Sequence, residues 1–419
     1  MTITLPRGLV QASGGPRYTV AVAVDALGTG MLRPFLLLYG IKVVGLSATT
    51  TGIAMTAGIV TGLACTPAVG RWLDRGARSD AVAAAMLVRI LGVLLLLATP
   101  GGNPGMFAAA ALFLGIGNQA WPAAHAALIA TVSTGRTRDA ALAAARSVRN
   151  AGMGIGALVA AACLAGGTTA LKGLAAATAV GYATAAVLAW SVHVSAAPPA
   201  RPSSAAPAAP APSMRAVLLA NVVFAFCLNV PEVALPLVLA TQVHASPVWS
   251  AGVLVLNTVL VVALQVGVTV RMSRFPRHIT LMAAGIILTL SYLGFLLATP
   301  LHHGLAAPVI TAVSALCTFG EVLYAGSATA LVAATAPPQA LGRALARLQL
   351  SSGLGLAISP AVMTTLAAHG SATLWGSLAL ATLAAAAAAG RHGRPPRRRS
   401  VPAAAGRATV RPRRTATPG

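Results

Sequence analysis

The stretch AVAVDALGTGMLRPFLLLYG, residues 21–40, is an apolar run that contains one aspartate and one arginine. A helix of this length spans about 30 Å, the thickness of the hydrocarbon core of a bilayer. A charge inside such a helix costs roughly a few kcal/mol, so it is retained where it faces a cavity or a partner. We therefore expect a transmembrane helix in which Asp25 and Arg33 have a functional role.

Apolar segments of this kind recur along the whole chain. Its 419 residues are 57% hydrophobic and only 8% charged, which excludes an ordinary soluble domain. Twelve segments of sufficient length occur, at residues 17–40, 46–70, 81–99, 105–132, 139–165, 169–192, 215–240, 247–270, 279–299, 304–334, 341–366 and 371–390. The sequence predicts an all-α integral membrane protein with twelve transmembrane helices.

Arginine is concentrated at every second connection between these segments. The intervening connections contain only Lys42 and Lys172. Since positive charge marks the cytoplasmic side, we expect a multi-pass protein of the bacterial cytoplasmic membrane with both termini in the cytoplasm. This topology accounts for the net charge of +23, and the basic end of the chain is expected to contact anionic lipid rather than nucleic acid.

A segment rich in Pro, Ala and Ser divides the predicted helices six and six. The predicted organisation is a six-helix bundle at 1–192, a cytoplasmic linker at 193–213, a second bundle at 214–390 and a disordered basic tail at 391–419. The bundles resemble repeats, because GNQAWPAAHAALIA from Gly117 aligns without gaps with GEVLYAGSATALVA from Gly320. Two pseudo-symmetric bundles of this kind rock around a binding site near the midplane.

The connection after the second segment reads GRWLDRGARSD, starting at Gly70. It resembles the signature of the major facilitator superfamily, Gly-x-x-x-Asp-Arg followed by glycine and further basic residues, which is supplied here by Gly70, Asp74, Arg75, Gly76 and Arg78. The resemblance implies that the chain has the fold of this superfamily. It also implies that the chain is a secondary transporter that works by alternating access.

This motif is expected to form a conformational latch that consists of Gly70, Asp74, Arg75 and Arg78. Asp74 is expected to accept hydrogen bonds from the N-terminus of a neighbouring helix, and to pair with Arg75 or Arg78. The resemblance implies that this neighbour is the helix that begins near Leu341. The corresponding segment of the second half, VRMSRFPRH, keeps the arginines but has no acid, so no equivalent latch is expected there.

The fifth segment departs from the pattern of the family's drug antiporters, Gly-x-x-x-Gly-Pro-x-x-Gly-Gly. It preserves Gly152 and Gly156, whereas Ala157 replaces the proline and alanines replace the last two glycines. The resemblance to antiporters therefore covers this helix only in part.

Only six carboxylates occur in the chain, and three of them, Asp25, Glu232 and Glu321, fall inside predicted helices. A chain that avoids acids almost everywhere keeps these three where they cost most. Asp25 is the first candidate for proton coupling, paired at similar depth with Arg146 or Arg149. A purely structural ion pair is the alternative.

Arg33 and Glu232 are expected at similar depth toward the outer side, one in each half. An ion pair between them would link the halves and open and close during the transport cycle. A structural role is again the alternative for Glu232.

Asn118, Trp121 and His125 share one helical face, and Glu321 and Tyr324 are the repeat mates of the first two. A stripe of amide, aromatic and ionisable groups predicts the wall of a substrate cavity. The predicted cavity residues are Arg33, Asn118, Trp121, His125, Glu232, Glu321 and Tyr324. Trp121 can alternatively be packing, and His125 either relays protons or is simply hydrogen-bonded.

The leading hypothesis is a monomeric, proton-coupled exporter of small amphipathic molecules that works by antiport. The alternatives are a proton-coupled uptake permease and a transport-inactive sensor or scaffold. An enzyme is not expected, because no His/Glu metal spacing and no GxxxxGK[ST] loop occurs, and no cofactor or metal is predicted. The intramembrane acids point to cationic substrates, although nearby arginines can neutralise them.

Overall fold

The computed structural model describes residues 7–163, 166–195, 214–301 and 303–391. Within these ranges the chain is helical, and the one extended pairing is an isolated bridge between Ala77 and Ser195. The all-α prediction is confirmed. Residues 196–213 of the predicted linker and 392–419 of the predicted tail lie outside the described residues.

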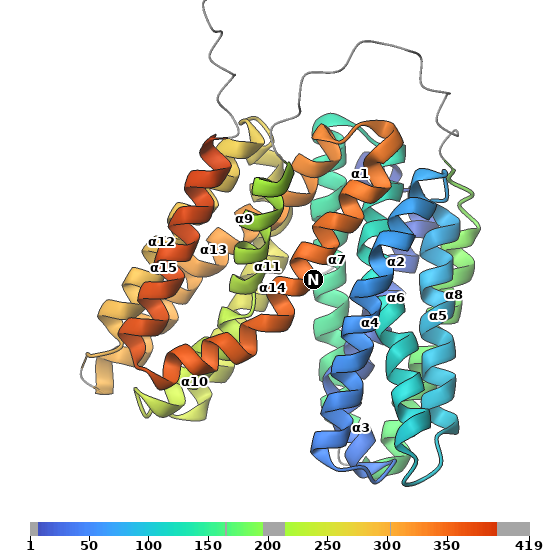
Figure 1. The fold of residues 1–419 in the computed structure, drawn as a ribbon, viewed down its shortest axis with the longest axis horizontal. Helices are drawn as coiled ribbons and strands as arrows, with labels where there is room; N and C mark the ends of the chain where they lie inside the picture. Colours follow the sequence, from blue (N-terminus) through green and yellow to red (C-terminus); the bar gives the residue numbers. More distant parts are fainter. Residues whose placement is uncertain (1–6, 164–165, 196–213, 302, 392–419) are drawn as a thin grey trace, which may run out of the picture.

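The helices form two groups, which follow one another in the sequence (Figure 1). The first group consists of α1 (Arg7–Ala12), α2 (Gly15–Leu32), the 3₁₀ turn η1 (Arg33–Phe35), α3 (Leu36–Lys42), α4 (Ala48–Asp74), α5 (Ser79–Ala98), α6 (Pro104–Val132), α7 (Gly135–Cys163) and α8 (Gly167–Trp190). The second consists of α9 (Met214–Cys227), the π-helical turn η3 (Val230–Ala234), α10 (Leu235–Thr241), α11 (Pro247–Met272), α12 (Arg277–Ala298), α13 (His303–Thr335), the 3₁₀ turn η4 (Pro338–Ala340), α14 (Leu341–Ala368) and α15 (Ser371–Arg391).

Nine of the described helices are long and apolar enough to cross a membrane, and ten if the bent pair α2 and α3 is one span. The other two long helices, α6 and α7, have 29 residues each. Their polar and charged residues lower their hydropathy, but 29 residues span about 43 Å. The described part of the chain therefore accommodates the twelve predicted membrane helices.

Two spans are interrupted at corresponding places. In the first group α2 gives way to η1 at Arg33, and in the second α9 gives way to η3, which contains Glu232. Both breaks contain a proline beside the charged residue, and proline cannot complete the regular hydrogen-bond ladder. The breaks place Arg33 and Glu232 at the point where the first span of each group bends.

The two groups have separate hydrophobic cores that are joined at one end. One buried cluster belongs to the first group alone and another to the second alone. A third contains residues of both, including Leu73 and Ala127 from the first and Val332 and Leu345 from the second. Because it surrounds the connections that contain arginine, we call this end the arginine-rich end; it is the top of Figure 1.

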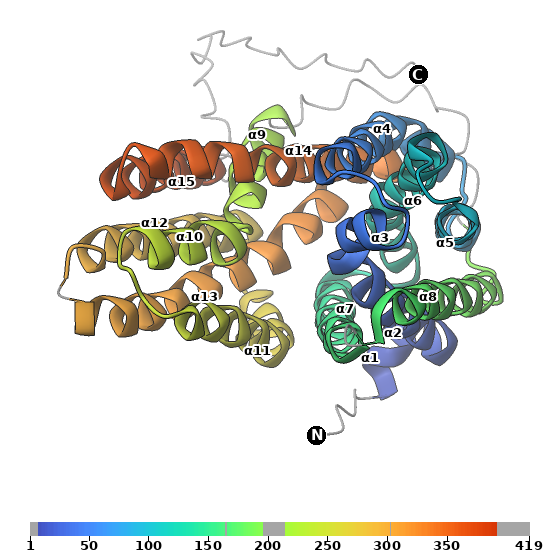
Figure 2. The same ribbon diagram turned by 90° about the horizontal axis from the view of Figure 1, so that it is seen from below.

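Two pairs of helices form most of the interface between the groups. Helix α14 packs against α4, and α11 packs against α7, as Figure 2 shows from the opposite end. Close approach of α14 depends on glycine, because a Cβ on Gly342 would lie 2.5 Å from the Cβ of Leu73 and 2.6 Å from the carbonyl oxygen of Gly70.

Candidate functional site

Asp74 joins α4 to the N-terminus of α14. Its Oδ1 accepts hydrogen bonds from the backbone N–H of Gly342 at 2.7 Å and of Arg343 at 3.3 Å, and its Oδ2 accepts one from Arg343 Nε at 2.6 Å. A Cβ on Gly70 would lie 2.7 Å from the Cβ of Ala346, so glycine permits this approach. The structure confirms the expected contact between Asp74 and the helix that begins at Leu341.

The expected pairing of Asp74 with Arg75 or Arg78 is wrong. Arg75 is exposed, and Arg78 instead donates to the Leu73 carbonyl and, at 2.8 Å, to Thr131 Oγ1. Arg78 is thus buried, and its hydrogen bonds stay within the first group. The cation that pairs with Asp74 is Arg343, which comes from the other group and was not singled out from the sequence.

A second connection between the groups occurs where the sequence predicted none. Asp139 Oδ2, near the start of α7, accepts a hydrogen bond from Arg277 Nη2 at 2.6 Å. The neighbouring Arg138 donates to the Ala333 carbonyl of α13 at 3.0 Å. The segment around Arg277 has no acid of its own, and the prediction failed because α7 supplies the acid.

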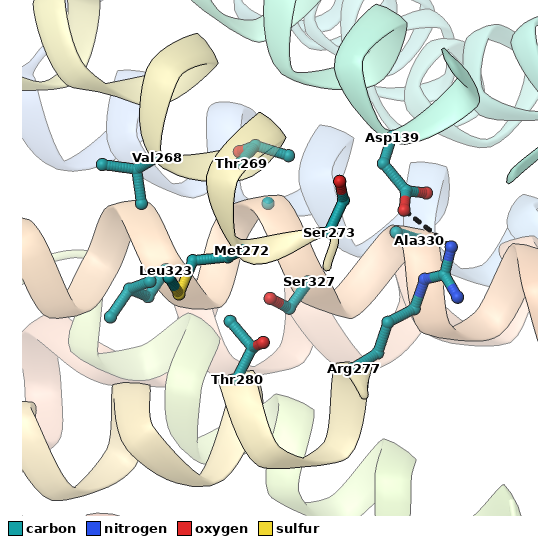
Figure 3. A pocket seen from close by; sticks show the side chains of 11 residues that line it. Asp139, Val268, Thr269, Met272, Ser273, Arg277, Thr280, Leu323, Ser327 and Ala330 are labelled. Atoms are coloured by element: carbon teal, nitrogen blue, oxygen red, sulfur yellow. Dashed lines mark hydrogen bonds and ion pairs between the residues drawn. The ribbon is translucent and has the colours of Figure 1, made fainter. Parts of the chain in front are cut away.

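Figure 3 shows a small pocket beside this second connection, enclosed by α11, α12 and α13. Its volume is about 10 Å³, and a similar pocket lies beside Tyr18 and His125. Such a volume holds about one water molecule. Neither pocket is large enough to be a substrate site.

These contacts close the arginine-rich end. The deepest polar contact between the groups is a hydrogen bond of 3.0 Å from Gln349 Nε2 to Gln119 Oε1. Beyond it, toward the other end, the ion pairs and hydrogen bonds found in the described residues stay within one group. The two groups of helices are therefore joined at the arginine-rich end.

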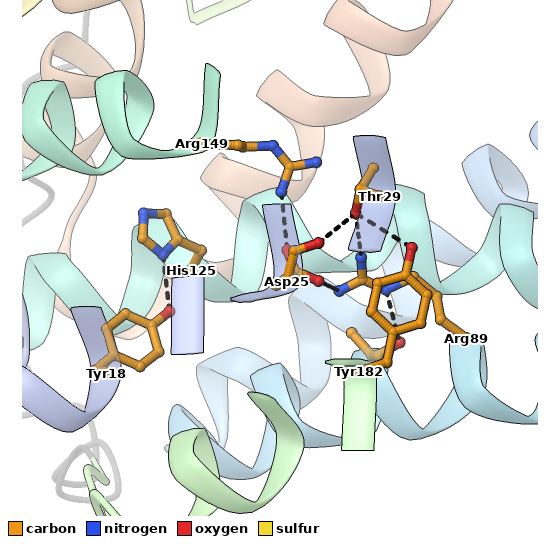
Figure 4. Close-up of polar contacts among 8 residues, drawn as sticks. Tyr18, Asp25, Thr29, Arg89, His125, Arg149 and Tyr182 are labelled. Carbon is orange, nitrogen blue, oxygen red and sulfur yellow. Dashed lines mark hydrogen bonds and ion pairs between the residues drawn. The ribbon is translucent and has the colours of Figure 1, made fainter. Parts of the chain in front are cut away.

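Asp25 lies in the centre of the first group between two arginines (Figure 4). Its Oδ1 is 2.6 Å from Arg89 Nη2, and its Oδ2 accepts a hydrogen bond from Arg149 Nη1 at 3.2 Å. The side chains of Asp25 and Arg89 are fully buried, whereas that of Arg149 is 19% exposed. Of the two arginines expected beside Asp25, Arg149 is the partner and Arg146 is not.

Arg89 is held on three sides and was missed as a partner of Asp25. Its guanidinium lies 4.5 Å above the ring of Tyr182, and its Nη1 donates to Thr29 Oγ1 at 3.4 Å. Thr29 and Tyr182 are themselves hydrogen-bonded at 3.2 Å. Arg89 is one of the few arginines predicted inside a span, and that position was the available signal.

An aromatic stack connects Arg149 to the base of α2. The guanidinium of Arg149 lies 4.3 Å from the ring centre of Trp121, and Trp121 stacks on His125 at 4.6 Å. His125 Nδ1 is 2.8 Å from the hydroxyl of Tyr18. Trp121 and His125 thus face one cluster, as their spacing predicted, and His125 is hydrogen-bonded and buried.

Glu321 occupies the corresponding region of the second group but has different neighbours. Its Oε2 accepts a hydrogen bond from Asn257 Nδ2 at 3.0 Å, and the thiol of Cys317 lies 3.9 Å from its Oε1. No arginine or lysine nitrogen lies within ion-pair distance of it in the described part of the chain. The carboxyl is buried among neutral donors.

Tyr324 lies one turn further along α13 and points to α9. Its hydroxyl donates to Asn221 Oδ1 at 2.8 Å, and its ring stacks on Phe224 at 5.1 Å. Asn221 in turn donates to Ser351 and Ser352 of α14. Tyr324 therefore ties α13 to α9.

Several buried polar atoms lack a hydrogen-bond partner in the described residues, among them Asn118 Oδ1 and Trp121 Nε1 of α6 and Arg146 Nε of α7. The charge of Arg146, on α7, acts electrostatically on Glu321 and Tyr324 of the second group. Arg146 therefore lies near the second group, and α6 and α7 both contact helices of that group. Buried polar atoms without partners are rare in native proteins and indicate a place where a ligand or water binds.

Arg33 and Glu232 do not pair in this structure. Both side chains are exposed, and no ion pair joins them in the described ranges. The expected pair is absent because the groups are closed at the arginine-rich end, while these residues lie at the helix breaks toward the other end.

The two glycines of α7 pack against α2. A Cβ on Gly152 would lie 2.7 Å from the Cβ of Ala26, and one on Gly156 would overlap the carbonyl oxygen of Leu27. Both glycines therefore allow α7 to approach α2 closely. This approach brings Arg149 to Asp25.

Residues 18–321 match the family model of the Major Facilitator Superfamily. A bacterial protein of Deinococcus radiodurans, named "Putative sugar efflux transporter", is 27% identical over 239 residues, which cover 54% of this chain and 60% of that protein. The chain thus spans less than two thirds of the length of this relative.

Solved structures share the fold at low sequence identity. The human organic anion transporter MFSD10 (TETRAN) matches with a TM-score of 0.71 and 13% identity, over 92% of this chain and 100% of that chain. A bacterial homologue of the iron transporter ferroportin in an outward-facing state matches with a TM-score of 0.70 and 12% identity, over 90% and 97%. FucP in its outward conformation matches with a TM-score of 0.69 and 12% identity, over 91% and 99%.

Proposed function

The chain belongs to the Major Facilitator Superfamily, and we propose that it exports small organic molecules from the bacterial cytoplasm in exchange for protons. Its substrate binds between the two groups of helices, which rock to expose the site on alternate sides of the membrane. The positive-inside rule assigns the arginine-rich end to the cytoplasm, so this structure is an outward-facing state. The protein is proposed to act as a monomer in contact with lipid.

The observation that carries this proposal is a set of buried, unpartnered polar atoms on α6 and α7, two helices that contact the second group. Asn118, Trp121 and Arg146 each keep a buried atom without a hydrogen bond. A structural scaffold has no need of such atoms, because unsatisfied polar groups destabilise a fold. A transporter needs them, because its substrate supplies the missing partners when it binds.

Proton coupling is better assigned to Glu321 than to Asp25, the first candidate from the sequence. Protonating Asp25 would leave the guanidinium groups of Arg89 and Arg149 without their common counter-charge. Glu321 accepts hydrogen bonds from the neutral groups of Asn257 and Cys317. Its protonation therefore does not deprive a hydrogen-bonded cation of its counter-charge. Arg146 then supplies a positive charge nearby that stabilises the ionised form between proton-bound states.

Exchange follows if substrate and proton exclude each other at Glu321. A hydroxyl or amino group of the substrate donates to the ionised carboxylate, whereas a bound proton removes that acceptor. A proton that enters across about 100 mV releases about 2.3 kcal/mol, which drives the substrate outward. The name of the Deinococcus relative supports export and a hydrogen-bonding, sugar-like body for the substrate.

The test is flux in proteoliposomes with an imposed pH gradient, measured for glucose, gluconate, glucosamine and a set of small amphipathic compounds. We expect uphill movement of at least one compound against the proton flow, and loss of that movement in Glu321→Gln while exchange without a gradient continues. Movement together with protons would instead indicate an uptake permease. Absence of flux for every compound would favour a sensor or scaffold and refute the proposal.

A further inference from the structure

We infer that the substrate carries a carboxylate or similar anionic group, and that this group binds in the first group of helices at Arg149, Arg146 and Trp121. The inference rests on the proposed function and specifies its substrate: a small acid with further hydrogen-bonding groups, as in a sugar acid. It replaces the cationic substrate that the intramembrane acids pointed to.

Arg149 is a surplus cation in its own cluster. Arg89 alone balances Asp25, since its Nη2 is 2.6 Å from the carboxylate and both side chains are fully buried. Arg149 contacts the same carboxylate at the longer distance of 3.2 Å and is 19% exposed. Two guanidinium groups therefore share one negative charge. A charge that is largely buried is costly in free energy unless a counter-ion neutralises it.

The second group of helices does not supply the missing counter-ion. Glu321 is the one buried acid there, and Arg146 is an additional cation that faces it. With Asp25 and Glu321 opposed by Arg89, Arg146 and Arg149, the buried centre has three positive and two negative groups. Arg33 and Glu232 add one charge of each sign at the exposed breaks and leave this difference unchanged.

Unused hydrogen-bond donors lie next to the surplus charge. The ring of Trp121 lies 4.3 Å from the Arg149 guanidinium, and its Nε1 has no partner. Arg146 precedes Arg149 by three residues, so both project from one face of α7, and Arg146 Nε is also without a partner. Guanidinium and indole N–H groups only donate, and a carboxylate only accepts. Charge-assisted hydrogen bonds of this kind are the strong ones.

Glu321 then binds the other end of the substrate. Its carboxylate accepts from a hydroxyl group of the substrate, at the place where a proton competes with it. The anionic group is bound by the first group of helices and the hydroxyl by the second, so one substrate holds both groups of helices together. This division separates recognition of charge from exchange with protons.

Binding to the purified protein tests the inference with three radiolabelled probes: gluconate, glucose and glucosamine. They are close in size and hydroxyl content but carry a negative, no and a positive charge. We expect gluconate to bind at least about tenfold more tightly than the other two, the gain that a charge-assisted hydrogen bond brings. Arg149→Gln should reduce this preference to within about twofold, because it removes the surplus charge.

Several variants keep the test decisive. Arg149→Gln leaves the fully buried pair of Asp25 and Arg89, so the protein should still fold. Arg149→Lys retains the charge and should keep most of the preference. Arg274→Gln, an exposed arginine at the arginine-rich end, is the matched control and should change nothing.

Equal binding of the three probes, binding of none, or a preference that persists in Arg149→Gln would overturn the inference. Because binding is measured without a membrane gradient, it fails independently of transport. Flux of glucose without a binding preference for gluconate would refute the anion site but still support the proposed exporter. A binding preference for gluconate without flux of any compound would refute the proposed exporter but still support a charge-selective binding site.

Discussion

Asp25 and Glu321 are both buried acids in the middle of a membrane helix bundle, but their surroundings differ. Asp25 is bound by two arginines of its own group of helices, at 2.6 and 3.2 Å. Glu321 is bound by an amide and a thiol, and the nearest influence of a cation comes from Arg146 across the interface. The first acid thus has both of its counter-charges within its own bundle. The second has no ion-pair partner in the described residues, and for this reason we propose that it changes its protonation state.

The difference shows that the cost of burying an acid does not by itself identify a proton carrier. Both acids are equally unexpected in an apolar helix. What separates them is whether the compensating charge is fixed within the same rigid unit or lies in the unit that moves. Predictions that compare the two residues therefore test the account directly.

The largest expected effect is on stability. Asp25→Asn leaves Arg89 and Arg149 buried without a counter-charge and should lower the free energy of unfolding by about 3–5 kcal/mol. Glu321→Gln keeps an oxygen that accepts from Asn257, loses only the weak acceptor for the Cys317 thiol, and should cost less than about 1 kcal/mol. Thermal unfolding of both variants in the same detergent measures the difference, and equal losses would mean that the two acids have similar roles.

The next effect concerns pairs that the transport cycle must break. Asp74→Asn weakens three hydrogen bonds to α14, and should move the equilibrium toward the inward-facing state by about tenfold. Asp139→Asn should act in the same direction, because it removes the ion pair to Arg277.

Accessibility of single cysteines placed near the two ends measures this shift, with Asp80→Asn, an exposed acid, as the control. The inner position should become more accessible and the outer position less accessible. If neither changes in either variant, these contacts are only structural and do not favour one conformation.

The smallest effect is expected at the helix breaks. Glu232 and Arg33 are exposed and unpaired in this state, so Glu232→Gln and Arg33→Gln should each alter the free energy of unfolding by less than about 0.5 kcal/mol. The same thermal unfolding experiment measures these variants beside Asp25→Asn. A loss as large as that of Asp25→Asn would show that the two residues form an ion pair most of the time.

Composition and periodicity were sufficient to predict the fold. Bilayer thickness fixes the length of each apolar segment. The helix that Asp74 contacts followed from the resemblance to the major facilitator superfamily. Pairing within the site was predicted less well. Depth along a helix selected both Arg146 and Arg149 as partners of Asp25, but only Arg149 forms the ion pair.

The remaining pairs depend on contacts between distant segments. Arg89 reaches Asp25 from α5, and Arg277 reaches Asp139 from α12, so neither pair has a local sequence pattern. Arg33 and Glu232 were matched by depth alone, whereas their distance depends on the state of the transporter. A single sequence contains no information on which state is adopted.

The central claim is that Glu321, and not Asp25, takes up a proton. Infrared difference spectroscopy of the protein in lipid detects it directly, because a carboxyl group that gains a proton gains a C=O band that an amide or a carboxylate does not give. We predict that a step from alkaline to neutral pH, at which exposed carboxyl groups stay ionised, produces this band in the native protein, and that the band persists in Asp25→Asn and disappears in Glu321→Gln. A band that disappears in Asp25→Asn and persists in Glu321→Gln would contradict the account.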